Sequence, residues 1–261
     1  MNTLYTAPMR LLAIATSFAL TISIARADDL SAASILERSR QSGALGLVNA
    51  SADIQLTVDD GHGATKQRRL TAAAIQLPNE VRRVVRFVEP SDVRGVAVLV
   101  TEKPGEPAER LLYLPNQKRV RRISGRQGSQ SFEETDFSYA DLDLAGGQGD
   151  QQTREADAPV GGNPCWVVTT VPVESPYGKV VTYVHQKTSV PLQVLFYGKD
   201  GALTKRLKVS RVKQVDGHWY AFESVMETPG KGTKTTLTIT RLDTKATLSP
   251  DDFTEQALAR E

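Results

Sequence analysis

The sequence of 261 residues has a single cysteine, Cys165, and only three histidines. One cysteine excludes an internal disulfide framework and a zinc site built from several cysteines. His62, His185 and His218 lie far apart and lack the spacing of metal ligands, and two of them stand in glycine-containing turns. These shortages predict a protein without a metal centre and without disulfide cross-links.

Motifs of covalent and phosphate chemistry are also missing. The sequence has no G-x-S-x-G, no G-x-x-x-x-G-K-[ST] and no G-x-G-x-x-G after a strand. Ser210 and Lys213 match S-x-x-K, but in a strand an offset of three residues places them on opposite faces. Cys165 lies between Pro164 and Trp166 in a β-rich run, which favours a buried hydrophobic role over a nucleophilic one. We therefore expect no catalysis, no metal and no cofactor.

An excess of one charge is absent as well. The chain has 32 Lys and Arg against 30 Asp and Glu, and Arg10 and Arg26 belong to a segment that we expect to be removed. Removing these two leaves 30 of each sign, so the charge does not indicate a nucleic-acid partner. The basic run Lys118–Arg122 is either a patch for acidic lipid or, as we expect, a solvated strand edge.

The longest apolar run, Leu11–Ile24, lies near the N-terminus and has 14 residues. That is short of the roughly 20 residues that span a bilayer. Arg10 precedes the run, and Ala25 and Ala27 follow it at the −3 and −1 positions of a signal-peptidase site. We predict a signal peptide at residues 1–27, cleaved after Ala27. With no cysteine near that site and no later apolar span, the mature protein is expected to be soluble and periplasmic.

The mature chain begins with one predicted helix and continues mostly as strands. Leu30–Leu47 has helical apolar spacing with Ser31 as N-cap, and the pattern becomes β-rich from Ala50 onward. The candidate strands are Ser51–Asp59, Thr65–Gln76, Val81–Glu89, Val96–Glu102, Arg110–Leu114, Arg119–Ser124, Cys165–Glu174, Val180–Lys187, Leu192–Tyr197, Leu203–Val215, Trp219–Glu227 and Lys234–Leu242. The connections are too short for crossover helices, so we expect an antiparallel meander.

One segment interrupts the strands. Ser131–Ala145 lacks alternation and carries acidic and aromatic residues that suit a short helix, and the polar stretch Asp150–Asn163 that follows is interpreted as a loop. A further short helix is expected at Asp251–Ala259. Because each half of the strands alone has little to cover it, we predict that residues 28–261 form a single domain.

Several strands have one apolar face, as in a sheet with one wet side. Tyr220, Phe222 and Met226 share such a face, and Glu223 and Glu227 lie opposite. A sheet this wide must curl on itself. The predicted fold is mainly β: a curved antiparallel sheet forming an incomplete, half-open β-barrel with short α-helices lidding an apolar cavity. A barrel interior completely filled by side chains fits the pattern about equally well.

Five short motifs in a fixed order resemble the outer membrane lipoprotein-sorting protein family, relatives of the periplasmic carrier LolA. They are Arg86–Pro90, Arg94-Gly95 with Leu99, Leu112–Pro115, Arg121–Ser124 and Asp136–Leu142. Downstream, Trp166, Tyr183, Pro191, Tyr197, Gly201, Lys205 and Trp219 also follow the family order. The resemblance covers most of the mature chain. One departure is Glu133-Glu134, where such proteins usually carry a small or apolar pair.

The resemblance implies a carrier that shields acyl chains of a lipid or lipoprotein and moves them between inner-membrane and outer-membrane partners, with an inner-membrane exporter as a possible donor. The alternative is a non-enzymatic envelope adaptor with a solidly packed barrel. We predict that the ligand would contact Phe87, Arg94, Leu99, Tyr113, Phe137, Tyr139, Leu142, Tyr220 and Phe222. Among these, Arg94 is the candidate partner of a head group at the cavity mouth. The cargo itself is not indicated by the sequence.

Overall fold

The computed structural model describes residues 1, 30–40, 42, 46–142, 149–173 and 175–260. The predicted signal peptide lies almost wholly outside the described residues. In the described part of the chain, no helix is long and apolar enough to cross a membrane.

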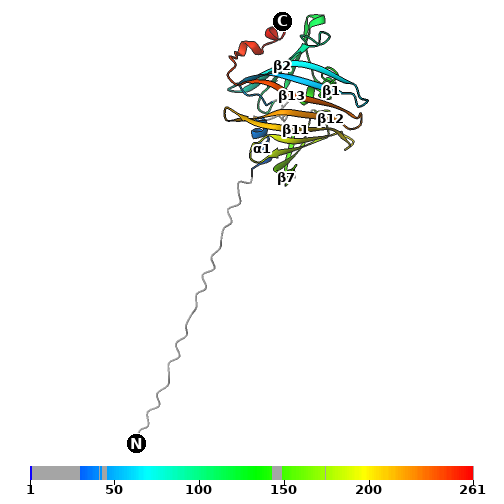
Figure 1. The fold of residues 1–261 in the computed structure, drawn as a ribbon. Helices are drawn as coiled ribbons and strands as arrows, with labels where there is room; N and C mark the ends of the chain where they lie inside the picture. Colours follow the sequence, from blue (N-terminus) through cyan, green and yellow to red (C-terminus); the bar gives the residue numbers. More distant parts are fainter. Residues whose placement is uncertain (2–29, 41, 43–45, 143–148, 174, 261) are drawn as a thin grey trace.

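Thirteen strands in this part of the chain form one antiparallel sheet (Figure 1). They are β1 (Ala50–Asp59), β2 (Thr65–Leu77), β3 (Glu80–Glu89), β4 (Ala97–Glu102), β5 (Glu109–Leu114), β6 (Arg119–Arg122), β7 (Gln151–Val160), β8 (Asn163–Val171), β9 (Lys179–His185), β10 (Pro191–Tyr197), β11 (Leu203–Val215), β12 (His218–Thr228) and β13 (Thr233–Asp243).

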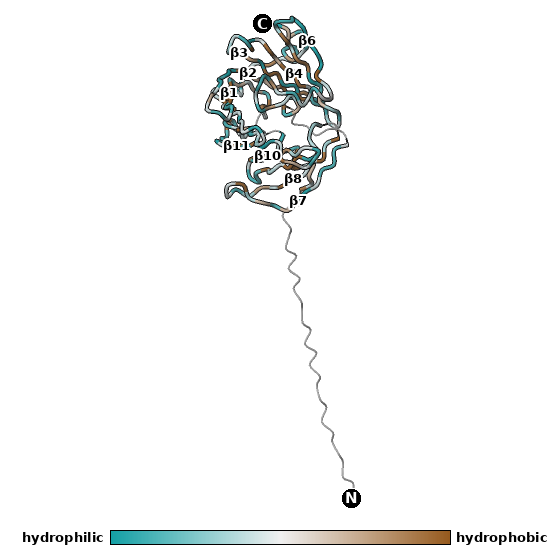
Figure 2. Tube along the Cα trace, turned by 90° about the vertical axis from the view of Figure 1, so that its right-hand side faces the viewer, coloured by the Kyte–Doolittle hydropathy of each residue, from teal (hydrophilic) through white to brown (hydrophobic). Residues whose placement is uncertain are grey.

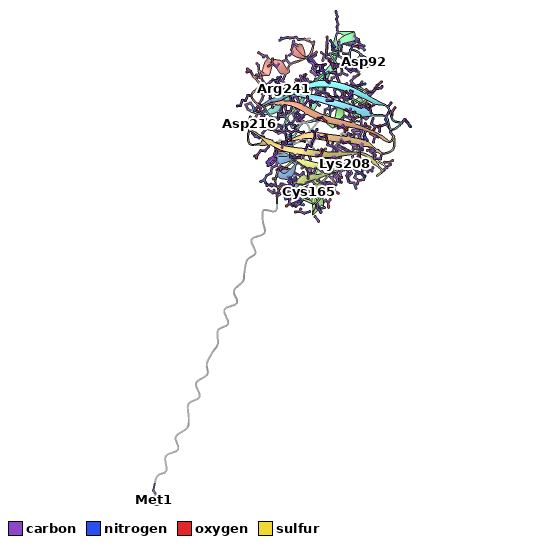
Figure 3. All side chains as sticks on the ribbon, viewed as in Figure 1. Met1, Asp92, Cys165, Lys208, Asp216 and Arg241 are labelled. Atoms are coloured by element: carbon purple, nitrogen blue, oxygen red, sulfur yellow. The ribbon has the colours of Figure 1, made fainter. Side chains whose placement is uncertain are left out.

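The sheet consists of two meanders joined in the middle. Strands β1 to β6 follow one another in space, as do β7 to β13, and the pairing of β1 with β13 joins the two sets. The edges are β6 and β7, and the described strands form no ladder between them. Seen from the side, the sheet curls so that β3 to β6 lie at one end and β7 and β8 at the other (Figure 2). The predicted fold class, an unclosed antiparallel barrel, is confirmed.

The inner face of this curl holds the main core. Alternate residues of the central strands point into it, such as Ile54 and Leu56 of β1 and Leu237 and Ile239 of β13. Their neighbours Gln55 and Thr57 are only half-buried on the outer face. The period of two predicted from the sequence therefore defines the wet and dry sides of the sheet.

The helix α1 (Ala32–Arg40) packs inside the curl. Ile35 is completely buried in a cluster with Val168 of β8 and Val184 of β9. The pairing of Val168 with Thr182, and of Thr182 with Val194, places these side chains on the face that carries the main core. The helix is shorter than predicted. The chain has left it before Leu47, which lies in the core without regular structure, and glycines such as Gly46 disfavour a longer helix.

A second, smaller apolar cluster lies on the outer face. The C-terminal turns η4 (Pro250–Phe253) and α2 (Glu255–Leu258) cover it, with Phe253 and Leu258 packed on Leu99 and Tyr113. The predicted single helix over Asp251–Ala259 is divided, because Thr254 is extended (φ −120°, ψ 162°) and acts as the N-cap of α2.

Two arginines of β3 donate hydrogen bonds to these turns. Arg82 Nη1 donates to the carbonyl of Phe253 at 3.2 Å, and Arg86 Nη2 donates to that of Leu258 at 2.8 Å. Burial lowers the pKa of Arg86. Donation to the last carbonyls of a short helix satisfies acceptors that have no partner within it.

The prediction of a loop over Asp150–Asn163 is wrong. Gln151–Val160 forms β7, an edge strand paired only with β8. Its side chains are almost all exposed or half-exposed, so the sequence has no apolar alternation there. The hydrogen bonds to β8, rather than burial, make this segment a strand.

Candidate functional site: the interior of the curled sheet

Residues 131–142, the plug segment, leave the sheet after β6 and fill its interior. Ser131 and Ser138 form an isolated bridge, and the segment ends in the 3-10 helix η3 (Tyr139–Leu142). Its four large side chains belong to the main core, with relative exposures of 2% for Phe132, 5% for Phe137, 4% for Tyr139 and 4% for Leu142. The plug segment therefore contributes four large side chains to the apolar interior of the curled sheet.

Three rings of this interior stack in series. The centroid of Phe132 lies 4.9 Å from that of Phe87 on β3, with the planes at 46°, and 5.6 Å from that of Tyr139 in an edge-to-face arrangement. Such pairs contribute roughly 0.5–1.5 kcal/mol each beyond area burial. Burial is the main cause that raises the pKa of Tyr139 to about 12, so its hydroxyl stays protonated at neutral pH.

The middle of the plug segment is fixed by a buried carboxylate. Asp136 Oδ1 accepts hydrogen bonds from Thr228 Oγ1 at 2.6 Å and Thr233 Oγ1 at 2.5 Å. Thr235 Oγ1 donates to Asp136 Oδ2 at 2.7 Å and accepts from the Asp136 amide at 2.9 Å. Three hydroxyls around the β12–β13 hairpin thus replace the water that the carboxylate lost on burial.

The C-terminal end of the plug segment is fixed by a buried ion pair. Asp141, whose side chain is 0% exposed, accepts from Lys205 Nζ of β11 at 2.6 Å. It also accepts from Tyr177 Oη at 2.7 Å and from the amide of Ser138 at 2.7 Å. Burial and the Asp141 carboxylate raise the pKa of Tyr177 far above its usual range. Asp136 and Asp141 are therefore polar anchors at the middle and near the C-terminal end of the plug segment.

Glu133 and Glu134 do not prevent the segment from packing inward. Both have left-handed backbones, with φ of 48° and 59°, so the chain turns sharply between the buried Phe132 and the anchors. Glu134 lies at the rim and pairs with Lys66 at 3.0 Å and Arg68 at 3.3 Å. Glu133 is half-buried, and this desolvation raises its pKa. Glycine would adopt these angles at lower cost because it has no Cβ.

Little free volume is left beside the plug segment. An apolar cavity of about 10 Å³, enough for about one water molecule, lies between Leu142 and the inner faces of β2, β3 and β4. Its lining residues are Leu47, Ala72, Ala73, Arg83, Val84, Val85, Val100 and Leu142. In the described residues this cavity does not accommodate an acyl chain while the plug segment is in place.

Known structures share this fold. A family model described as uncharacterized-protein-like matches residues 79–260. The crystal structure of a domain described as an outer membrane lipoprotein-sorting protein, from Vibrio parahaemolyticus, is 26% identical, with a TM-score of 0.78 over 88% of this chain and 98% of that one. The chain belongs to the family of this model, and its resemblance to outer membrane lipoprotein-sorting proteins is confirmed. No curated protein matches it.

Two further solved structures share the fold of this chain. A DUF1329 family protein from Desulfovibrio piger has a TM-score of 0.77 at 24% identity, covering 87% of this chain and 97% of that one. A LolA superfamily protein from Nitrosomonas europaea has a TM-score of 0.67 at 17% identity, covering 87% and 99%. The fold is therefore LolA-like along nearly the whole length of these chains.

The structure brings six of the nine predicted ligand contacts together. Phe87, Phe137, Tyr139, Leu142 and Tyr220 lie in the main core, and Phe222 packs against it half-buried. They come from β3, the plug segment and β12, which are far apart in the sequence.

The other three predicted contacts lie elsewhere. Leu99 is on the outer face, because its neighbours Val98 and Val100 point inward, and Tyr113 lies beside it under the C-terminal turns. Arg94 is exposed in the turn between β3 and β4. The period of two placed each residue on a face, but the sequence did not reveal that this part of the sheet is covered on both sides.

Sequence reasoning missed a buried ion pair at the other end of the interior. Arg83 Nη1 lies 2.5 Å from Glu102 Oε2, and both side chains are under 10% exposed. The signal was present as Arg83 in phase with Val85 and Phe87 on an inward-facing strand. In the described residues, no group of three or more His, Cys, Asp or Glu is placed to hold a metal ion.

Proposed function

We propose that the protein is a periplasmic carrier that takes up the acyl chains of a lipid or lipoprotein inside the curled sheet. It would pass them between inner-membrane and outer-membrane partners, with an inner-membrane exporter as donor. The observation that carries this proposal is the plug segment: apolar side chains of one short insertion fill an unclosed sheet, and two polar anchors hold them there. Such a filling can be exchanged for a ligand without breaking the ladder of strands.

The free energy gained by burying the acyl chain of the cargo is similar in size to the free energy lost by exposing the plug side chains. Sealing about 15 methylenes of a hexadecanoyl chain from water contributes roughly 12 kcal/mol, at about 0.8 kcal/mol each. Exposing four buried plug side chains costs roughly 6–12 kcal/mol, at about 1.5–3 kcal/mol each. Because the two terms nearly cancel, loading and release are both reversible, as transfer between two membranes requires.

The proposed site of action follows from the N-terminus and from the relatives. Residues 1–27 have the pattern of a secretory signal peptide, which would deliver residues 28–261 to the periplasm as a single domain. The described name of the Vibrio parahaemolyticus relative refers to lipoprotein sorting at the outer membrane. Carriage by burial needs apolar area and no nucleophile, so the proposed activity involves no catalysis.

A second candidate is an envelope adaptor that binds protein partners by its surface. The packed interior, with a cavity of about 10 Å³, favours this alternative. Native mass spectrometry after mild purification from the periplasm separates the two. Co-purifying lipid, or a mass increase after incubation with a pyrene-labelled fatty acid, supports the carrier. A protein that remains ligand-free at high probe concentration rejects it.

A further inference from the structure

We infer that the inner end of the barrel near Arg83 is a binding site for the anionic head group of an acyl-chain ligand, a carboxylate or a phosphate. This inference rests on the proposed carrier function and specifies its substrate class. It follows from three arginines, Arg40, Arg83 and Arg110, here called the arginine cluster, and from the apolar cavity beside them.

The strand register brings two of these arginines to one row. Arg83 of β3 pairs with Val100 of β4, and Val100 pairs with Arg110 of β5. Val100 points into the main core, so its two cross-strand neighbours point the same way. Glu102, two residues beyond Val100, lies on this inner face as well.

The third arginine comes from α1. Arg40 is the last residue of this helix, and it interacts electrostatically with both Glu102 and Arg83. Its other partner is Glu37, one turn earlier on the more exposed side of the helix. Arg40 and Arg110 are both half-buried, and this burial lowers the pKa of each guanidinium group. Glu102 raises the pKa of each, so it is the carboxylate around which the cluster is arranged.

One donor of the cluster is buried without an acceptor. Arg83 is 7% exposed, and its Nη1 donates to Glu102 at 2.5 Å. Its Nε has no hydrogen-bond partner in the structure. An unsatisfied buried donor on a charged group costs more than one on a neutral group, and an anion beside it would remove this cost.

The same arginine lines the apolar cavity. Arg83 and Val100 form one wall and Leu142 of the plug segment another. When the plug segment moves aside, this cavity widens into the space left by Leu142 and by the rings above it. A ligand with an acyl tail in that space would place its head group among the arginines. A guanidinium group binds carboxylate and phosphate groups equally well. The arginine cluster would therefore select the charge and shape of the head group, and the apolar interior would select the length of the acyl chain.

Arg68, another buried arginine, also has a donor without a partner, Nη1, but it lies away from the apolar cavity. Arg68 lies at the opposite end, with its guanidinium carbon 5.9 Å from the centroid of the Phe87 ring and Nη2 on Glu134. It is not part of the cavity lining. Arg94, predicted from the sequence for the head group, is exposed on a turn. Arg83, rather than Arg94, is therefore the proposed partner of the head group.

The test compares two probes that differ only in the charge of the head. Pyrene-labelled hexadecanoic acid and its methyl ester are titrated into the full mature chain, and binding is read from pyrene fluorescence. We expect the acid to bind roughly tenfold more tightly than the ester. In the double variant Arg83→Gln/Glu102→Gln, which leaves neither charge buried alone, the acid should fall to the affinity of the ester while the ester is unchanged.

A matched control lies on the outer face. Arg69 and Glu89 form an ion pair between β2 and β3 with both side chains exposed. The double variant Arg69→Gln/Glu89→Gln removes the same two charges and should retain the preference for the acid. If Arg83→Gln/Glu102→Gln melts before the assay temperature, Arg40→Gln, at the end of α1, replaces it and should reduce the preference about threefold.

The outcomes separate the site from the function. Equal binding of acid and ester by the wild-type chain, or an unchanged preference in the folded Arg83→Gln/Glu102→Gln variant, overturns the head-group site and leaves the carrier. Failure of both probes to bind overturns the carrier function and the head-group site with it. If inorganic phosphate raises the melting temperature and competes with the acid, the cluster is a site for free anions, and the head-group assignment is wrong.

Discussion

Asp141 and Lys205 form an ion pair in which the carboxylate side chain is completely buried, with 2.6 Å between Oδ2 and Nζ. The two residues are separated by 64 positions in the sequence, and the contact attaches the end of the plug segment to β11. Tyr177 donates a third hydrogen bond to the same carboxylate. The plug segment is thus bound to the second meander by a charge, although it follows the first meander in the chain.

Removing one partner of this pair should be more harmful than removing both. Lys205→Met leaves Asp141 buried without its cation and should lower the free energy of unfolding by about 3–5 kcal/mol. The double variant Asp141→Asn/Lys205→Met should recover part of that loss. Urea denaturation of the three chains measures this. Equal losses for the single and double variants would show that Tyr177 alone compensates the carboxylate.

Weakening the plug segment should strengthen ligand binding. Phe137→Leu removes contacts inside the curl and should cost about 1–2 kcal/mol of stability. Because that loss falls on the plugged state, the affinity for an acyl probe should rise roughly 5- to 30-fold. If the plug segment never leaves the interior, the affinity for the acyl probe should not rise.

Phe253 provides the control for this effect. It is 2% exposed, like the plug rings, but packs on the outer face. Phe253→Leu should lower the melting temperature by a similar amount and leave the probe affinity unchanged. An equal gain in affinity from Phe253→Leu would mean that general loosening, rather than release of the plug segment, admits the ligand.

Glu133 should make the protein less stable as the pH rises. Burial raises its pKa above the ordinary 4.5. As the pH rises through this window the unfolded chain loses the proton first, so the folded state becomes relatively less favourable. Glu133→Gln cannot ionise and should gain stability relative to the wild type between pH 4 and pH 7. Melting temperatures of both chains across this range test the sign.

The neighbouring residue should behave in the opposite way. Hydrogen bonding from Lys66 and the charges of Lys66 and Arg68 lower the pKa of Glu134, so its ionised form is favoured in the folded state. Its contribution is present above the ordinary pKa and is lost as the pH falls through the lowered value. Glu134→Gln should therefore lose stability relative to the wild type as the pH rises. If the stability of Glu133→Gln and of Glu134→Gln changes in the same direction with pH, this assignment is wrong.

The C-terminal turns should detach when their guanidinium partner is removed. Arg86→Met keeps much of the apolar stem but leaves the carbonyl of Leu258 without its donor. We expect faster amide exchange over residues 250–259 and little change in β1 and β13. Hydrogen exchange with mass spectrometry measures both regions. Uniformly faster exchange would show that these turns support the whole sheet.

The sequence predicted the sheet better than it predicted the contacts across it. Strands that are buried on one side, such as β12 with Tyr220 and Phe222, were recognisable because burial imposes a period of two. β7 was missed because an exposed edge strand has no such period. The face of Leu99 was misjudged for another reason: the turns that cover it come more than 140 residues later.

The polar anchors were beyond sequence reasoning for a geometric reason. Asp136 finds three threonines on a hairpin more than 90 residues away, and nothing local in the sequence encodes that meeting. Glu133 and Glu134 stand where the resembling proteins usually carry a small or apolar pair. Their left-handed backbone angles instead turn the charges to the rim while Phe132 stays inside. The spacing of side chains on an ideal helix or strand does not foresee such a turn.

The pairing of β1 with β13 also determines when folding can finish. All other ladders join strands that are neighbours in the chain and can form soon after synthesis, whereas β1 waits for residues 233–243. Until then each meander has one uncovered apolar face and an unpaired edge strand. Such a partly folded chain completes folding slowly and is prone to aggregate. β13 thus completes the sheet. A chain truncated before Thr233 would be left with two separate half-sheets that expose apolar faces.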